Sequence, residues 1–409
     1  MSSQEENQNK NVNKNVSAKI VDKIKQIQSH SLPSLPSLPS LPSLPDFPTY
    51  EECMRKSKEF WESFTFFSKN NYEALDRMWA RGKDFLGTKY AIMGGAMSWL
   101  SERHLVSAIS NGGGFGIIAS GGMKPDILRT EIQAVRMMTS KPFGVNVITM
   151  HRQIDEMLDV CIEEEVTHIV FAGGVPTAPH IKKVKDAGIK VICFAPTLAM
   201  AKRLIRLGTD ALLIEGSESG GHIGPISTLI LAQEILPHIT EVPVFVAGGV
   251  GTGGALVSFL EMGAAGCQIG SRFVCATECI AHPNFKKSFM RANSRDAMPM
   301  IQIDPRFPVI SVRALGNEGT KHFIAAQKEA IARFENGEID AKTVQDEIEH
   351  FWVGALKKAA IDGDVENGSV MAGQSVGLID KEQPAAEIIE NLVEDSVNEI
   401  SKRRKLLEG

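Results

Sequence analysis

Cysteine is scarce in this sequence, with six residues among 409, and no two of them form a CxxC pair. A chain of this length with so few scattered cysteines does not depend on a disulfide framework. Cys193 and Cys267 lie inside apolar, strand-like runs, where a thiol behaves as a small hydrophobic side chain. The sequence therefore predicts reduced cysteines and a cytoplasmic protein.

Long apolar runs and an excess of positive charge are also absent. No stretch approaches the ~20 consecutive apolar residues of a membrane-spanning helix, and residues 1–16 lack the apolar region of a signal peptide. The formal net charge is −5, from 44 basic and 49 acidic side chains, whereas nucleic-acid-binding domains carry a basic face. Histidines at metal-ligand spacing and Cys/His clusters are missing too. We expect no membrane, nucleic-acid or metal partner, but a small-molecule substrate.

The first 48 residues are predicted to form a disordered arm. Residues 1–30 are rich in Asn, Gln, Lys and Glu, and cannot bury enough apolar surface to offset the cost of ordering the chain. From Ser31 to Pro45 the tripeptide Ser-Leu-Pro repeats five times, and proline at every third position fits the three-residue turn of polyproline II. We expect a solvated spacer, with partner binding as the alternative. Residues 49–85, where aromatics lie among charges, are predicted to form a helical lead-in.

From residue 86 onward, short apolar and β-branched runs alternate with helical stretches, which indicates βα units and a parallel sheet. Eight such units predict an α/β fold of the (β/α)₈ TIM barrel type. A doubly wound open sheet is the competing arrangement, because periodicity does not show closure. Later helical patterns predict a C-terminal helical addition from about residue 320, at 321–335, 341–360 and 384–400. The eight runs are 91–93, 115–118, 143–147, 168–171, 191–194, 211–214, 244–247 and 267–269.

Glycine recurs where the strands of the predicted barrel end, which is where barrel enzymes place their active sites. Gly248 and Gly249 follow the seventh run, and Gly270 and Ser271 follow the eighth. Barrel enzymes commonly hold a phosphate at these two loops, where free backbone N–H groups attract an anion. A tight βα turn also explains one such loop, but two in consecutive positions predict a phosphorylated ligand. Neither loop reads GxxxxGK[ST], so a P-loop nucleotidase is not expected.

His222 is an ionisable residue within the glycine-rich loop that follows the sixth run. An imidazole there can exchange protons near neutral pH, which makes His222 the candidate catalytic residue. A structural histidine is the alternative, although the neighbouring Gly220 and Gly221 offer little side-chain packing. Glu215 and Glu218 of the same loop either face the ligand or are solvated, and the sequence leaves both alternatives open.

In their order along the chain, several motifs resemble the nitronate monooxygenase (2-nitropropane dioxygenase) family of FMN-dependent barrels. That family also contains the type II flavin-dependent enoyl-acyl-carrier-protein reductases. The resemblance extends from about residue 90 to residue 397 and does not cover residues 1–85. The motifs are Gly94-Gly95-Ala96-Met97, Pro142-Phe143-Gly144-Val145-Asn146, Glu218-Ser219-Gly220-Gly221-His222-Ile223-Gly224, Ala247-Gly248-Gly249, Gln268-Ile269-Gly270-Ser271-Arg272-Phe273 and Gly368-Ser369-Val370-Met371-Ala372-Gly373-Gln374.

The resemblance implies bound FMN. Its phosphate would lie at the loops of Gly248, Gly249, Gly270 and Ser271, and its ring along the segment from the first motif. That segment supplies Gly95, Ala96 and Met97, while Asn146 and Gly221 are further cofactor contacts implied by the resemblance.

The resemblance leaves the reaction open. In the family's monooxygenases the histidine matching His222 assists oxidation of an alkyl nitronate, and electrons pass through FMN to O₂ to give a carbonyl compound and nitrite. In the reductase branch NAD(P)H reduces FMN, which then reduces an enoyl thioester; a quinone is another acceptor. Gly94-Gly95-Ala96-Met97 departs from the Gln-Gly-Gly-Met of the reductases and favours the monooxygenase, whereas the motifs at 218–224 and 368–374 favour the reductase. A non-catalytic flavin-binding assembly protein is a third alternative, and a homodimer is left open.

Overall fold

The computed structural model describes residues 70–300, 302–307 and 311–408. The predicted arm and most of the predicted helical lead-in lie outside these residues. Within the lead-in, residues 70–78 are helical, and helix α3 (Ala80–Leu86) follows them. The boundaries proposed between arm, lead-in and barrel stay predictions.

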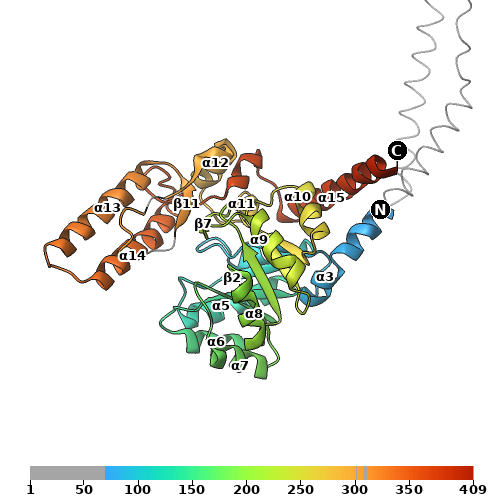
Figure 1. The fold of residues 1–409 in the computed structure, drawn as a ribbon, viewed down its shortest axis with the longest axis horizontal. Coiled ribbons are helices and arrows are strands. Elements are labelled where there is room, and N and C mark those ends of the chain that lie inside the picture. Colours follow the sequence, from blue (N-terminus) through green and yellow to red (C-terminus); the bar gives the residue numbers. More distant parts are fainter. Residues whose placement is uncertain (1–69, 301, 308–310, 409) are drawn as a thin grey trace, which may run out of the picture. The chain divides into compact units, whose positions relative to one another are not determined.

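Eight parallel strands form the predicted (β/α)₈ barrel (Figure 1), in the order β1-β9-β8-β6-β5-β4-β3-β2. The barrel closes between its outer strands, because Phe115 N–H donates to the Ile92 carbonyl oxygen (2.8 Å) and Gly94 N–H to that of Phe115 (2.9 Å). This closure excludes the doubly wound open sheet. Every strand begins and ends within one residue of its predicted run. The strands are β1 (Ile92–Gly94), β2 (Gly116–Ala119), β3 (Phe143–Ile148), β4 (His168–Ala172), β5 (Lys190–Phe194), β6 (Ala211–Glu215), β8 (Val244–Ala247) and β9 (Gly266–Ile269).

Helices follow the barrel strands and pack outside them. In the first of these helices, Leu105, Val106 and Ile109 are buried, a spacing that places apolar side chains on one helical face. The helices are α4 (Arg103–Asn111), α5 (Pro125–Met138), α6 (Ile154–Glu163), α7 (Ala178–Asp186), α8 (Leu198–Leu207), α9 (Thr228–Ile235), α10 (Gly253–Glu261), α11 (Ser271–Val274) and α12 (Pro283–Arg291), with 3-10 turns η1 (Leu236–His238) and η2 (Ser294–Asp296).

Alternate strand residues fill the interior of the barrel, as the twofold periodicity of a strand requires. Val170, Ile192, Leu213 and Phe245 belong to one buried cluster enclosed by the strands, whereas their sequence neighbours face the helices. At the amino end of the strands, His168 Nε2 lies 3.0 Å from the carbonyl oxygen of Phe85 in α3. Helix α3 therefore closes that end, and the carboxyl end is left for the site.

The two cysteines predicted to act as core residues are fully buried. Burial raises the pKa of the Cys193 thiol to about 11 and that of Cys267 to about 12. Both thiols are therefore protonated at neutral pH, which confirms their role as small hydrophobic side chains.

A second, antiparallel sheet connects the barrel to the C-terminal addition. It comprises β10 (Ala297–Pro299), β11 (Val312–Leu315) and β7 (Gly221–His222), in the order β10-β11-β7. Strand β7 belongs to the loop after β6, so this sheet joins the loop of His222 to residues some 90 positions later in the chain.

The predicted C-terminal helices are α13 (Glu318–Glu335), α14 (Ala341–Ala360) and α15 (Ala385–Glu408). Helices α13 and α14 form a hairpin (orange in Figure 1), in which the ring centroids of Phe323 and Trp352 are 4.2 Å apart. Helix α15 continues beyond its predicted end at residue 400, where Arg403 pairs with Glu261 of α10. The 3-10 turn η3 (Gln374–Leu378) precedes α15.

Across the part of the chain that the structure describes, no helix is both long enough and apolar enough to cross a membrane.

Candidate active site

The two glycine-rich loops predicted to hold phosphate are neighbours, because β8 and β9 pair directly up to Ala247 and Gln268. Gly248 and Gly249 have φ angles of 93° and 75°, in the left-handed region that favours glycine. A Cβ atom on Gly248 would lie 2.9 Å from Thr228 Oγ1 and 3.0 Å from the Gly216 carbonyl oxygen. Both the backbone conformation and the space therefore require glycine at position 248.

Backbone N–H groups in these loops are available to an anion. Among residues 70–300, 302–307 and 311–408, the N–H groups of Gly248, Gly249, Gly270 and Ser271 have no hydrogen-bond acceptor. Successive free N–H groups in such turns form concave anion-binding sites. Helix α10 differs, because the N–H of its first residue, Gly253, donates to Asp395 Oδ2 (2.6 Å). The loops, rather than the start of α10, therefore fit a phosphate.

Ser271 joins this phosphate cradle, defined by Gly248, Gly249, Gly270 and Ser271, to the C-terminal segment. Its Oγ accepts a hydrogen bond from Gly373 N–H (2.9 Å). A serine hydroxyl that accepts one bond still has its own proton to donate. Ser271 can therefore bind an anion while it holds the C-terminal segment in place.

The loop after β1 lies directly against the phosphate cradle. Gly95 N–H donates to the Ile269 carbonyl oxygen (2.8 Å), and a Cβ on Gly95 would be 3.0 Å from Gly270 Cα. Ser101 Oγ accepts from Met97 N–H (2.9 Å) and donates to the Gly95 carbonyl oxygen (2.8 Å). The segment of Gly95, Ala96 and Met97 is thus a fixed surface that continues from the cradle.

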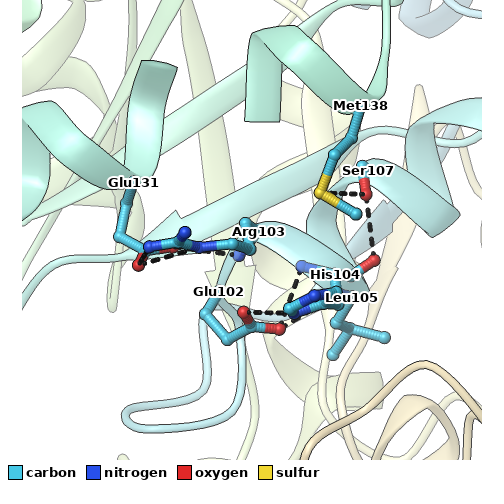
Figure 2. Close-up of polar contacts among 7 residues, drawn as sticks. All are labelled: Glu102, Arg103, His104, Leu105, Ser107, Glu131 and Met138. Carbon is cyan, nitrogen blue, oxygen red and sulfur yellow. Dashed lines mark hydrogen bonds and ion pairs between the residues drawn. The ribbon is translucent and has the colours of Figure 1, made fainter. Parts of the chain in front are cut away.

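Helix α4 anchors this loop at its other end (Figure 2). Glu102 caps the helix, since its Oε1 accepts from His104 N–H (3.0 Å) and its Oε2 lies 2.8 Å from His104 Nδ1. Arg103 contacts both carboxylate oxygens of Glu131 on α5, a two-pronged ion pair of the stronger kind. The first turn of α4 is therefore tied to α5 as well as to the β1 loop.

Three polar side chains lie at the carboxyl ends of barrel strands: Asn146 on β3, Glu215 on β6 and Gln268 on β9. Glu215 is two residues after the interior residue Leu213, so it faces inward. By the same alternation, Gln268 faces away from the outward neighbours Cys267 and Ile269. Burial raises the pKa of Glu215 to about 7, and Asn146 Nδ2 donates to the Val170 carbonyl oxygen (3.2 Å).

Of these three residues, the family resemblance implies Asn146 as a contact, the sequence leaves Glu215 open, and Gln268 is not predicted. An amide within an otherwise apolar strand was the signal for Gln268. A polar side chain there is costly to bury unless it meets a partner, so its position at the end of a barrel strand points to a ligand.

His222 lies at the tip of the loop after β6, opposite Val312 of β11, and Gly221 lies opposite Arg313. The imidazole is accessible to solvent, yet the protein around it lowers its pKa by desolvation. Accessibility and desolvation occur together when a side chain lines a concave surface. With a pKa below its ordinary value of about 6.5, His222 is neutral at pH 7.

The base of the His222 loop is closed by hydrogen bonds. Ser217 N–H donates to the Ile226 carbonyl oxygen (2.8 Å), and the Glu218 carboxylate accepts from Thr228 N–H (2.8 Å) and Oγ1 (2.9 Å). Glu218 is therefore a structural acceptor. The sequence left open whether its carboxylate faces the ligand or solvent, and in the structure it binds Thr228. Thr228 Oγ1 also lies 3.0 Å from the Gly248 carbonyl oxygen, so this loop and the phosphate cradle share a contact.

The C-terminal segment at residues 371–374 bridges the His222 loop and the cradle. A Cβ on Gly221 would be 3.6 Å from Met371 Sδ, and Gln374 N–H donates to the Glu218 carbonyl oxygen (2.9 Å). These contacts of the loop backbone connect His222 to the rest of the site. Its imidazole itself has no hydrogen-bond partner within the described part of the chain. All the site residues predicted from the sequence thus lie at the carboxyl end of the barrel: Gly95, Ala96, Met97, Asn146, Gly221, His222, Gly248, Gly249, Gly270 and Ser271.

The chain thus forms a closed (β/α)₈ barrel that carries, at its carboxyl end, glycine-rich loops with free backbone N–H groups and a neutral histidine. The family model for nitronate monooxygenase matches residues 80–161 and 148–395 of this chain, which is more than half of its length. The chain belongs to the nitronate monooxygenase family.

The chain matches individual relatives over nearly the whole of their length. The chain is 28% identical over 349 residues to a (3aS,4S,5R,7aS)-5-hydroxy-7a-methyl-1-oxo-octahydro-1H-indene-4-carboxyl-CoA dehydrogenase of Mycobacterium tuberculosis, covering 80% of this chain and 98% of that protein. It is 27% identical over 371 residues to a probable nitronate monooxygenase of Staphylococcus aureus, covering 79% and 99%. The solved structure of FabK from Thermotoga maritima is similar with 35% identity and a TM-score of 0.71, covering 80% and 98%.

The chain is an oxidoreductase enzyme, as its family and its named relatives are. This assignment favours catalysis over the alternative of a non-catalytic flavin-binding protein.

Proposed function

We propose that this protein is an FMN-dependent oxidoreductase that oxidises alkyl nitronates with O₂ to a carbonyl compound and nitrite. The observation that carries the proposal is the combination of the phosphate cradle with an accessible, neutral His222 at one end of a barrel. FMN, when bound, supplies two-electron chemistry that connects the substrate to O₂. The proposal also draws on membership of the nitronate monooxygenase family.

Several backbone and side-chain groups of this site suit FMN. The free N–H groups of Gly248, Gly249, Gly270 and Ser271 would hold its phosphate. The fixed segment from Gly95 to Met97 would support the ring. Asn146, Glu215 and Gln268 offer amide and carboxyl groups to the polar atoms of a flavin ring. Glu215 can act as a donor in its protonated form, which burial favours by raising its pKa.

His222 would act on the substrate. A nitronate carries its negative charge on the nitro oxygens, to which the N–H of a neutral imidazole can donate a hydrogen bond. The other ring nitrogen can accept a proton from a carbon next to a nitro group. A lowered pKa keeps the ring unprotonated at pH 7 and thus available as a base.

A second candidate function is the NAD(P)H-dependent reduction of an enoyl thioester, with a quinone as the other acceptor. It is favoured by the 35% identity to FabK and by the 28% identity to a dehydrogenase whose name specifies a carboxyl-CoA compound. In this alternative NAD(P)H is the co-substrate, and the protonated form of His222 would deliver a proton to the reduced product.

Anaerobic reduction of the bound flavin distinguishes the two reactions. The purified protein is mixed without O₂ with a simple alkyl nitronate, with NADH or with NADPH, and the flavin absorbance is followed. Bleaching by the nitronate, followed by nitrite release when O₂ is admitted, is the expected result. Bleaching by NADH or NADPH alone, with reoxidation by an enoyl thioester, would replace nitronate oxidation by the second function. No bleaching by any donor contradicts both.

A further inference from the structure

A buried arginine holds the small sheet that carries His222. Arg313 on β11 is 6% exposed, and its backbone pairs with Gly221 of β7. Its Nε donates to the Ser217 carbonyl oxygen (2.8 Å), and its Nη1 donates to the Ala297 carbonyl oxygen (2.5 Å). One side chain thus connects three segments: the base of the His222 loop, β10 and β11.

Packing alone does not explain a charged side chain at this position. Burial lowers the pKa of Arg313, and the nearby Glu218 carboxylate opposes that effect, so the guanidinium is a costly group that its surroundings partly compensate. Its planar fork presents donors in several fixed directions, which lets it reach two carbonyl groups on separate segments. A lysine at this position has a single ammonium group and cannot reproduce that geometry.

The geometry therefore assigns Arg313 a role as a positioning residue for His222. Among the described residues, its side chain donates no hydrogen bond to the phosphate cradle or to the imidazole. By tying the Ser217 carbonyl oxygen to β10 and β11, it fixes where strand β7 projects from the barrel, and with it the place of the His222 ring. This inference rests on the proposed function, because it requires that His222 takes part in the reaction.

The test uses full-length, flavin-loaded protein with Arg313→Met, Arg313→Lys and the control Arg295→Met. Arg295 is close in sequence to Ala297, but its side chain is 87% exposed. Because a displacement of about 1 Å can cost about 100-fold in rate, Arg313→Met should slow anaerobic flavin reduction by about 10- to 100-fold, by whichever donor reduces the wild type. Arg313→Lys should recover part of the rate, since it restores one donor. Affinity for FMN, measured by quenching of flavin fluorescence, should stay unchanged in all three variants.

Combining Arg313→Met with His222→Ala separates positioning from general structural support. If Arg313 acts through His222, the double variant should be no slower than His222→Ala alone. Multiplicative losses in the double variant, a matching loss of FMN affinity, or a wild-type rate in Arg313→Met would each overturn the positioning role. A wild-type rate in His222→Ala would instead overturn the acid–base role of His222 in the proposed function. If Arg313→Met still reduced the rate in that case, Arg313 would act through another part of the site.

Discussion

Substitution of Gly248 by alanine should damage the phosphate cradle more than it damages the fold. The φ angle of 93° imposes backbone strain on any L residue, at about 1–2 kcal/mol. The new Cβ would also lie 2.9 Å from Thr228 Oγ1, 3.0 Å from the Gly216 carbonyl oxygen and 3.1 Å from Gly216 N. Relief of these contacts moves Thr228 away and endangers the hydrogen bond that its hydroxyl donates to the Glu218 carboxylate, a loss of about 0.5–1.5 kcal/mol.

Gly188 offers a matched control for this substitution. Its φ angle is 80°, but a Cβ there has no atom within 4 Å. Gly188→Ala should therefore cost the strain alone, whereas Gly248→Ala should cost about 1–2 kcal/mol more and disturb the loop that is proposed to bind phosphate. A disturbance of that size corresponds to about a tenfold weaker affinity for FMN.

Flavin titration of the apoproteins and urea unfolding provide the two measurements. Both variants should unfold at lower urea concentration than the wild type, and only Gly248→Ala should bind FMN more weakly. Wild-type FMN affinity in Gly248→Ala would refute the placement of the phosphate at this loop. Equal loss of affinity in both variants would show that backbone strain, not the cradle, controls binding.

Three further predictions follow from the histidines and the arm. Burial lowers the pKa of His168 to about 4, so the unfolded chain binds a proton there more readily between about pH 6.5 and pH 4. The contribution of His168 to the free energy of unfolding is complete above pH 6.5 and is lost as the pH falls towards 4, by roughly 3 kcal/mol at most. In His168→Gln the free energy of urea unfolding should therefore depend less on pH over that interval. An unchanged pH dependence would contradict this prediction. His222→Ala should lower turnover by about 10²–10⁴-fold while FMN remains bound, as measured by steady-state rates and flavin content; equal turnover would remove His222 from the mechanism. Deletion of residues 1–45 should leave flavin content and turnover nearly unchanged, because their composition gives them no core to contribute, and a truncated protein without flavin would contradict that reasoning.

The barrel could be predicted from sequence because its signal is local and repeated. Each barrel strand is a short apolar run between helical stretches, and the observed boundaries differ from the predicted ones by one residue at most. The glycines at 248 and 270 were identifiable for a similar reason, since their positions after the last two strands are fixed by the order of the runs.

The second sheet could not be predicted in the same way. Strand β7 has only two residues, Gly221 and His222, and neither has a pattern typical of a strand. Its partner β11 lies about 90 residues later in the chain, and sequence periodicity does not encode pairing over such a distance. Arg313 was missed because an arginine in a sequence does not show that it is buried.

Two contacts at the site depend on the C-terminal addition and were equally hidden. Asp395 binds the first N–H of α10, and Gly373 binds Ser271. The sequence predicted helices in this part of the chain but not that its residues complete the mouth of the barrel. Only the packed structure brings these segments together.

Every role proposed for the site depends on FMN bound at the carboxyl end of the barrel and used there for oxidation and reduction. Heat release of the cofactor from folded, purified protein, with chromatographic identification, is the decisive experiment. The released cofactor should be FMN, and Gly248→Ala protein should carry less of it than Gly188→Ala protein. Release of FAD, or the absence of any flavin from well-folded protein that also fails to take up added FMN, would show that the site does not use FMN.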